Sequence, residues 1–367
     1  MERFTIDHLP ELLEDGDEPR LSSHLPMVRA GRETRQNAIR FKNMLRAAER
    51  ALAARGVGKR EAAALLERLQ AAGADERLWN RQLDGLAVYA TPERVRLYAC
   101  EQRFDESLTI AQRFNVVPLL PLLSNARRFL VLALSRNAVR LIAASSEDAT
   151  ELELGPGVPR GLTDVVGTDW EEQTLQPHSV REGTVFHGYG GTGDDRLPEL
   201  ETYCRRLDDA LTDDIAERHP ELARLPIVLA GDVQVTAMFR RAARRLSLLE
   251  ESVDGNHDRT LPTELKTLAW PIIAARIARE DAELVRLYQE RLAAWRASDD
   301  PEAILAAARE GRVETLLVRS GAGRTDGEPG AEPPANPAVV ATLANGGTAR
   351  ELENMPTDSP LAAIYRY

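Results

Sequence analysis

The sequence has few of the residues that build disulfide frameworks, metal centres or aromatic platforms. Cys100 and Cys204 are its only cysteines, which excludes a disulfide framework and a thiolate zinc cluster. Its six histidines show no metal-ligand spacing with cysteine or carboxylate, so we expect neither a metal nor a cofactor. Aromatic residues make up only 5% of the chain, which argues against sequence-specific binding of single-stranded nucleic acid.

Long hydrophobic runs are also missing. The longest, residues 116–123 and 129–134, are far shorter than the roughly 20 residues that a membrane-spanning helix needs. The first residues, Met1 to Asp7, lack the basic stretch followed by an apolar one that marks a signal peptide. Together with the scarcity of cysteine, these absences predict a cytoplasmic protein with no membrane partner.

The chain lacks a net positive charge, because its 58 acidic residues outnumber its 47 basic ones and leave a net charge of −11. Taken alone, this balance argues against a nucleic-acid partner. The exception is a basic block from Arg29 to Arg60, where ten cations face only Glu33 and Glu49. Such a block is either a solvated face or a phosphate-binding stripe.

The basic block contains a predicted helix at about residues 35–55. Its apolar positions recur at the spacing of a core-facing stripe, namely Phe41, Leu45, Ala48 and Leu52. Four of its cations fall on a separate side, namely Arg35, Lys42, Arg46 and Arg50. We therefore expect the helix to bury one face and to present the other to solvent or to phosphates.

The predicted elements divide the chain into three parts, residues 1–125, 126–254 and 255–367. The second part opens with two apolar strands, residues 128–135 and 138–144, that read as a hairpin. The third alternates helices with strands, which indicates an α/β layer domain. Further expected elements lie at residues 59–72, 85–90, 94–100, 197–215, 227–230, 280–295 and 301–310.

Glycines gather in His187-Gly188-Tyr189-Gly190-Gly191-Thr192-Gly193, four of them in seven residues, just before a helical pattern. Because glycine loses the most freedom on folding, such a cluster indicates a sharp turn or a close approach to a ligand. The spacing also satisfies the dinucleotide-binding pattern GxGxxG. However, no clear long strand precedes it, and Asp194 and Asp195 stand where a pyrophosphate would bind. Those two aspartates are more economically helix caps.

Two other polar segments carry weaker patterns. Residues 254–258 begin like a calcium loop, but Arg259 and Leu265 occupy positions where that loop needs glycine and glutamate, so we expect a polar turn. Residues 321–337 are rich in glycine, proline and acidic side chains, which predicts a mobile surface loop.

Short segments in all three parts form a further, ordered pattern. They are residues 36–43, 84–89, 97–104, 129–135, 187–192, 227–231, 306–317 and 362–367. In this order the segments resemble the archaeo-eukaryotic class I release factor and Pelota superfamily, in particular its bacterial members. The resemblance spans nearly the whole chain.

The resemblance implies a mixed α/β (α+β) fold of three domains. Residues 1–125 would form an N-terminal, decoding-like α+β domain with the basic helix. Residues 126–254 would form an RNase H-like middle domain with the glycine loop. Residues 255–367 would form a ribosomal-protein-like, Pelota-type α/β domain.

In that superfamily the glycine loop carries Gly-Gly-Gln and enters the peptidyl transferase centre, where the peptidyl-tRNA ester is hydrolysed. The resemblance thus implies a catalytic loop made of His187, Gly190, Gly191 and Thr192. Thr192 stands at the glutamine position, so it offers a backbone N–H for developing negative charge but no side-chain amide.

The resemblance also implies that the basic helix meets small-subunit ribosomal RNA. The candidate RNA-binding residues are Arg35, Asn37, Arg40, Lys42, Arg46 and Arg50. The nearest match to the superfamily's Asn-Ile-Lys-Ser loop is Asn37-Ala38-Ile39-Arg40. This departure predicts that the protein does not read stop codons.

We therefore expect a factor that binds the ribosomal A site in rescue, quality control or hibernation. Its implied partners are ribosomal RNA, peptidyl-tRNA and a translational GTPase. A first alternative is a peptidyl-tRNA hydrolase that uses Gly190-Gly191-Thr192. Others are a tRNA-cleaving nuclease built on the middle domain and a stress-related, non-ribosomal protein-binding factor. The sequence leaves open whether the protein is an enzyme.

Overall fold

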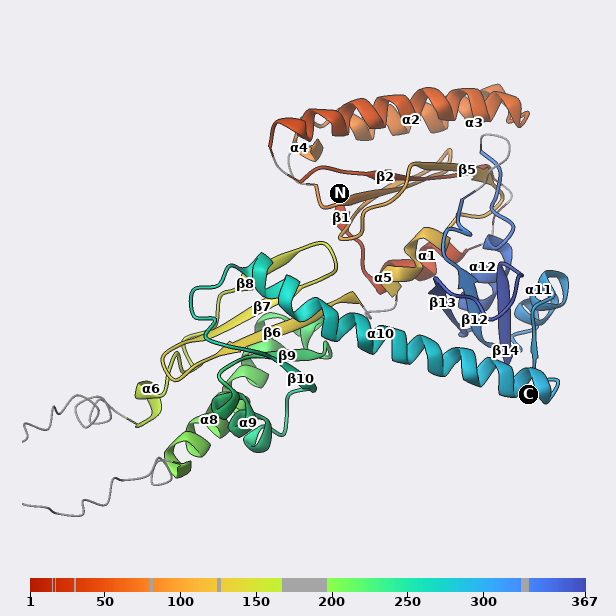
Figure 1. Ribbon diagram of the computed structural model, residues 1–367. Helices are drawn as coiled ribbons and strands as arrows, with labels where there is room; N and C mark the ends of the chain where they lie inside the picture. Colours follow the sequence, from red (N-terminus) through yellow and green to blue (C-terminus); the bar gives the residue numbers. More distant parts are fainter. Residues whose placement is uncertain are drawn as a thin grey trace, which may run out of the picture. The chain divides into compact units, whose positions relative to one another are not determined.

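The computed structural model describes residues 1–14, 16, 18–29, 31–79, 82–123, 127–166, 197–324 and 330–367. It contains a five-stranded sheet in the first part of the chain, a second five-stranded sheet and a final four-stranded sheet. The expected mixed α/β class is therefore confirmed (Figure 1). The chain forms two compact units, Met1–Asn125 with Arg279–Tyr367, and Ala126–Ala278. The three domain ranges expected from the sequence stay a prediction.

The first sheet has the strand order β1-β4-β3-β2-β5. Its strands are β1 (Glu2–Arg3), β2 (Arg20–Pro26), β3 (Gly85–Ala90), β4 (Val95–Cys100) and β5 (Ser107–Ala111). Two long helices, α2 (Arg35–Ala54) and α3 (Lys59–Gly73), cover one face of this sheet (Figure 1). The short helices of this part are α1 (Leu9–Leu13), α4 (Glu76–Trp79) and α5 (Leu120–Leu123).

The other face of the first sheet shares a hydrophobic core with the last part of the chain. Tyr89 and Tyr98 of the sheet belong to the same buried cluster as Ile304, Leu316 and Val339. The last sheet has the order β11-β14-β12-β13. Its elements are β11 (Ala297–Ser298), α11 (Pro301–Arg309), β12 (Val313–Arg319), α12 (Asn336–Ala344), β13 (Thr348–Leu352) and β14 (Leu361–Tyr365). Residues from both ends of the chain therefore bury one continuous core.

The segment 321–337, expected to be a mobile loop, is packed over much of its described length. The backbone N–H of Ile110 donates to the carbonyl of Gly330 at 2.9 Å. Ala335 is 2% exposed, and Asn336 is completely buried and begins α12. That part of the expectation is wrong, because the polar backbone finds hydrogen-bond partners in β5 that composition cannot reveal. Residues 325–329 lie outside the described part.

The second unit is built on a sheet of order β10-β9-β6-β7-β8. Its strands are β6 (Phe129–Leu134), β7 (Val139–Ala144), β8 (Ala149–Leu152), β9 (Ile227–Gly231) and β10 (Leu248–Asp254). The expected hairpin is confirmed, since β6 and β7 pair antiparallel. Alternate residues of β6 face opposite layers, as a strand's period of two requires: Leu130, Leu132 and Leu134 join one core cluster, and Phe129, Val131 and Ala133 join another.

Helices supply both layers around this sheet. They are α6 (Thr163–Val166), α8 (Leu197–Arg218), α9 (Val233–Ala242) and the first part of α10 (Pro262–Ala293). The expectation that the last of these begins near residue 280 is wrong. Pro271 reads as a helix break, yet Leu265, Ala269 and Ile273 bury completely against the sheet, and this packing outweighs the lost hydrogen bond.

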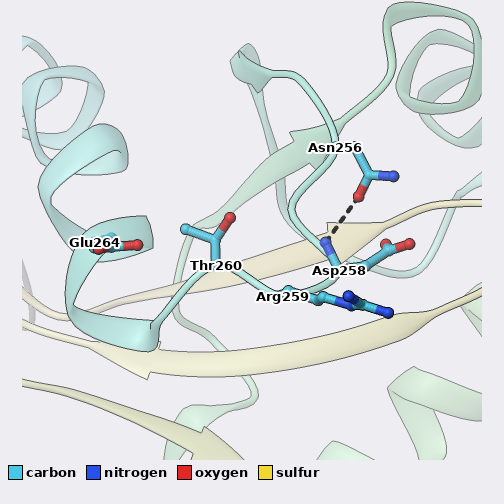
Figure 2. Close-up of a pocket in the computed structure, with 5 residues that line it drawn as sticks. All are labelled: Asn256, Asp258, Arg259, Thr260 and Glu264. Carbon is cyan, nitrogen blue, oxygen red and sulfur yellow. Dashed lines mark hydrogen bonds between the residues drawn. The ribbon is translucent and has the colours of Figure 1, made fainter.

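The segment after β10 is a polar turn, as expected. Arg140 organises it, because its Nη1 donates to the carbonyls of His257 at 2.8 Å and Thr260 at 2.9 Å. Figure 2 shows the surface hollow beside this turn, where the N–H of Asp258 donates to the side chain of Asn256 at 3.0 Å. Within the described residues, no group of three or more His, Cys, Asp or Glu side chains is arranged to hold a metal ion.

No helix in the described ranges combines the length and apolar character needed to cross a membrane.

Candidate nucleic-acid interface

The solvent-facing side of α2 carries a stripe of four cations, which we call the α2 stripe: Arg35, Lys42, Arg46 and Arg50. All four side chains are exposed. At 100° per residue they fall within an arc of about 80°, and at 1.5 Å per residue they span about 22 Å of the helix. The expected separation of charged and apolar sides is therefore confirmed.

Packing of the opposite side fixes the orientation of the α2 stripe. Phe41, Ala48 and Leu52 are at most 2% exposed, and Leu45 packs against the same cluster. These apolar side chains bury against strands of the first sheet and against α3. Rotating the helix to hide the cations would expose this apolar stripe, so burial holds the cations outward.

Asn37 lies on the same helix but is completely buried. Its Oδ1 accepts from the N–H of Val28 at 2.9 Å, and its Nδ2 donates to the carbonyl of Val28 at 2.8 Å. These two bonds tie the first turn of α2 to the end of β2. The side chain of this candidate RNA-binding residue therefore positions the helix instead of facing solvent.

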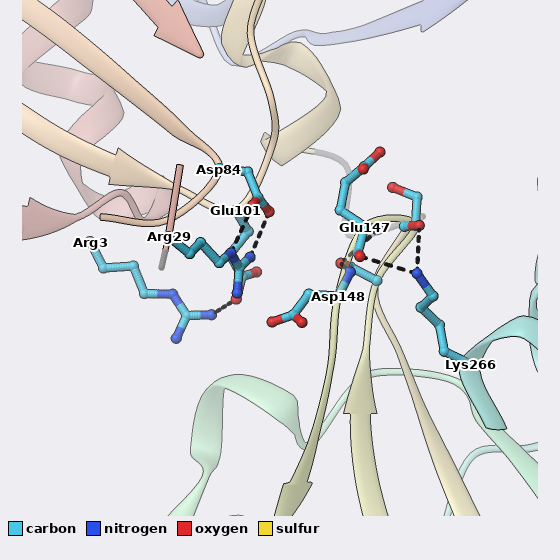
Figure 3. Close-up of polar contacts among 9 residues, drawn as sticks. Arg3, Arg29, Asp84, Glu101, Glu147, Asp148 and Lys266 are labelled. Atoms are coloured by element: carbon cyan, nitrogen blue, oxygen red, sulfur yellow. Dashed lines mark hydrogen bonds and ion pairs between the residues drawn. The ribbon is translucent and has the colours of Figure 1, made fainter. Parts of the chain in front are cut away.

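Two other cations of the basic block are engaged within the protein. Arg40 is half-buried, donates to the carbonyl of Pro26 at 3.1 Å and pairs with Glu106 at 3.7 Å. Arg29 forms a two-pronged pair with Asp84, with bonds of 2.8 and 2.6 Å (Figure 3). Such pairs satisfy the planar guanidinium and leave less of its charge for an outside ligand.

The α2 stripe differs from these engaged arginines. Over the described residues, none of its four side chains forms an ion pair or a hydrogen bond with the rest of the protein. Glu49 is the one carboxylate of the helix that comes near this side. A row of four Arg and Lys side chains near a single Glu on a rigid helix is suited to contacts with successive phosphates.

The candidate catalytic residues His187, Gly190, Gly191 and Thr192 lie outside the described residues. Their implied role stays a prediction from the sequence.

A buried polar cluster in the first sheet was not expected from the sequence. His24 of β2 is 1% exposed, with Nδ1 3.1 Å from Ser107 Oγ and Nε2 3.1 Å from Tyr89 Oη. Burial lowers the pKa of His24 to about 3, so the ring is neutral at physiological pH. The signal available in the sequence was a polar run, Ser22-Ser23-His24, between two leucines.

The two thiols are unsuited to nucleophilic chemistry. Burial raises the pKa of Cys204 to about 12 and raises the pKa of Cys100 as well. A thiolate is the reactive form of cysteine, and both side chains are therefore protonated near neutral pH. They act as core residues.

Comparison with the curated proteins gives no match. Among solved structures, the chain is similar to an archaeal Pelota described as a model of ribosome-bound Pelota and ABCE1, with 13% identity, 100% of this chain and 95% of that chain covered, and a TM-score of 0.39. It is also similar to S. cerevisiae Dom34, with 11% identity, coverages of 77% and 86%, and a TM-score of 0.39. It is also similar to the archaeal translation termination factor aRF1, with 15% identity, 99% of this chain and 96% of that chain covered, and a TM-score of 0.25.

The model of one protein family matches residues 128–312, which is just over half of the 367 residues. Its description is bacterial archaeo-eukaryotic release factor family 3. The match covers the sheet of the second unit, all of α10 and α11. The chain therefore belongs to family 3 of the bacterial archaeo-eukaryotic release factors.

Proposed function

We propose that this release-factor-like protein binds the ribosomal A site in place of a tRNA, without reading a stop codon. It would act in the cytoplasm in ribosome rescue, quality control or hibernation. The observation that carries the proposal is the α2 stripe, four exposed cations on one side of a 20-residue helix. Because the chain belongs to a release factor family, the phosphates that the α2 stripe would contact are those of ribosomal RNA.

An acidic protein can bind RNA through such a local surface. The net charge of −11 acts over the whole molecule, but salt screens charges that lie more than about 8 Å apart at physiological ionic strength. The α2 stripe would therefore dominate the field felt by a phosphate that touches it. Residues elsewhere would contribute little to this contact.

The buried state of Asn37 supports binding that is independent of the codon. Residues 37–40 are the nearest match to the superfamily's decoding loop, yet both polar atoms of the Asn37 amide are bonded to Val28. Arg40 is turned toward Pro26 and Glu106. Neither side chain is available to read a base edge, whereas the α2 stripe can contact backbone phosphates, which carry no sequence information.

Salt dependence of ribosome binding tests the proposal. Four phosphate contacts to structured RNA would release about three to four counterions, which gives a slope of about −3 to −4 in a plot of log affinity against log salt concentration. The measurement is co-sedimentation of the full-length protein with 70S ribosomes between 50 and 300 mM potassium chloride. Absence of pelleting at the lowest salt would contradict the proposal.

A further inference from the structure

The α2 stripe is interrupted by a large apolar side chain. Ile39 is 49% exposed, and in α2, which is described over its whole length, it is the one large apolar residue left exposed. At 100° per residue it falls inside the arc of the stripe, one turn after Arg35 and one turn before Lys42 and Asn43. Ile39 does not belong to the hydrophobic cluster under α2, so packing of the core does not explain it.

The charged and uncharged side chains of this face follow one another along the helix. Their order is Arg35, Ile39, Lys42, Asn43, Arg46 and Arg50, and all six are exposed. At 1.5 Å per residue, Arg46 lies about 16 Å and Arg50 about 22 Å beyond Arg35. The isoleucine and the asparagine lie between these ends, at about 6 and 12 Å from Arg35. The face therefore has arginines at both ends and an apolar and an amide side chain between them, with Lys42 at one side.

A single strand of nucleic acid would find no stacking surface on this face. Phe41 is the one aromatic residue of α2, and it is only 2% exposed. The neighbouring helix α3 contains no aromatic residue. Binding of single strands usually combines positive charge with aromatic rings on which the bases stack. Since α2 supplies only the charge, we expect it to bind an unpaired strand weakly.

An acidic protein segment also fits this face less well. The core of a protein interface is apolar and depleted of charged residues. On α2, all of which is described, Ile39 is the single exposed large apolar side chain, and cations stand four residues before it and three residues after it. One such side chain among cations does not form an apolar core.

A double-stranded RNA has a surface that matches this face. The major groove of an A-form helix is too deep and narrow for side chains to read, whereas the minor groove is wide and shallow and displays the 2′-hydroxyl groups. A phosphate-bearing strand borders the groove on each side. A straight α-helix that lies across the groove would bring cations at its two ends to the two strands, and its middle to the riboses.

We propose that α2 crosses the minor groove of double-stranded RNA. Arg35 contacts phosphates of one strand, and Arg46 and Arg50 contact phosphates of the other. Between them, Ile39 packs on the riboses, and the amide of Asn43 forms a hydrogen bond with a 2′-hydroxyl group. This inference rests on the proposed function, because it takes the α2 stripe as an RNA-binding surface and names the form of RNA that the stripe binds.

The test measures binding of fluorescein-labelled nucleic acids to the full-length protein by fluorescence anisotropy at 100 mM salt. The probes are a 16-base-pair RNA duplex, a DNA duplex of the same sequence and a 16-nucleotide oligouridylate, which forms no duplex. We expect the RNA duplex to bind at least about ten-fold more tightly than either other probe, because it alone combines two strands with a wide minor groove lined by 2′-hydroxyl groups. Lys42→Glu/Arg46→Glu should remove this binding.

Ile39→Ser isolates the apolar contact. It should weaken binding of the RNA duplex about five-fold, since about half of the isoleucine side chain remains to be buried. The slope of log affinity against log salt concentration should not change, because no charge is lost. Ala53→Ser is the matched control at an exposed position of the same helix beyond Arg50, and it should bind like the wild type. Asn43→Ala should weaken binding of the RNA duplex and leave that of the DNA duplex unchanged.

Equal affinity for the RNA duplex and for either other nucleic acid would overturn the inference, as would an unchanged affinity of Ile39→Ser or an absence of binding to the RNA duplex. Tighter binding of a labelled 16-residue oligoglutamate would also overturn it, because the face would then recognise an acidic protein segment. The proposed function is tested separately, by pelleting with ribosomes. Pelleting that Lys42→Glu/Arg46→Glu abolishes, together with equal affinities for duplex and single strand, would overturn this inference alone.

Discussion

Asn336 holds the backbone on both sides of Asn115. Its Oδ1 accepts from the N–H of Val116 at 3.0 Å, and its Nδ2 donates to the carbonyl of Phe114 at 3.0 Å. The side-chain Nδ2 of Asn115 in turn donates to the carbonyl of Gly323 at 3.1 Å. These bonds join the segment after the first sheet to the first residue of α12 and to the segment before it, so the two ends of the chain form one compact unit.

We expect Asn336→Ala to lower the free energy of unfolding by about 2–5 kcal/mol, because it leaves two buried backbone groups without partners. The measurement is equilibrium unfolding in urea. Asn43→Ala is a suitable control, since Asn43 is exposed on α2 and should change stability by less than about 0.5 kcal/mol. Equal midpoints for the two variants would show that the Asn336 bridge does not stabilise the unit.

His24 should make the protein sensitive to mild acid. Its pKa is about 3 in the folded protein and 6.5 in the unfolded chain, so the unfolded state binds the proton between these values. Titration of His24 therefore does not lower the free energy of unfolding above pH 6.5. Below this value it lowers that free energy by up to about 1.4 kcal/mol for each pH unit. Urea unfolding at pH 7.0 and pH 5.0 measures the loss.

His24→Gln serves as the comparison for this pH dependence. It removes the titrating ring, so its stability should fall less between pH 7.0 and pH 5.0 than that of the wild type, even if it is less stable at both values. Parallel losses in the two proteins would assign the acid sensitivity to other groups.

The glycine loop gives a prediction about chemistry. We expect neither the wild type nor Thr192→Gln to release peptide from ribosome-bound peptidyl-tRNA, because Asp194 and Asp195 would repel hydroxide and tRNA phosphates alike. The measurement is release of a labelled peptide from stalled ribosomes. Release by the wild type that survives Thr192→Ala and is lost in Gly191→Val would instead indicate a hydrolase that uses backbone N–H groups.

The periodic elements of this fold could be predicted from the sequence, whereas β2 could not. The stripe of Phe41, Ala48 and Leu52 predicts both the helix and its buried side, and the exposure of the opposite cations follows from it. Strand β2 is entirely buried, yet its Ser22, Ser23 and His24 look like loop residues. Their partners, among them Asn115 and Ser107, are distant in sequence, so no local pattern reveals them.

The candidate site divides in the same way. Four of the six predicted RNA-binding residues are exposed because helical periodicity sets their side. Asn37 and Arg40 lie on the same helix, but their contacts with Val28 and Pro26 depend on how the chain leaves β2.

Charge reversal on the α2 stripe tests the central claim most directly. Lys42→Glu/Arg46→Glu should abolish co-sedimentation with 70S ribosomes at 100 mM salt without unfolding the protein, because both side chains are exposed and unbonded within the described residues. Arg206→Glu/Arg224→Glu makes the same change in net charge at exposed positions of the second unit and should pellet like the wild type. Full pelleting of Lys42→Glu/Arg46→Glu would contradict the account, because the α2 stripe would then be only a solvated surface.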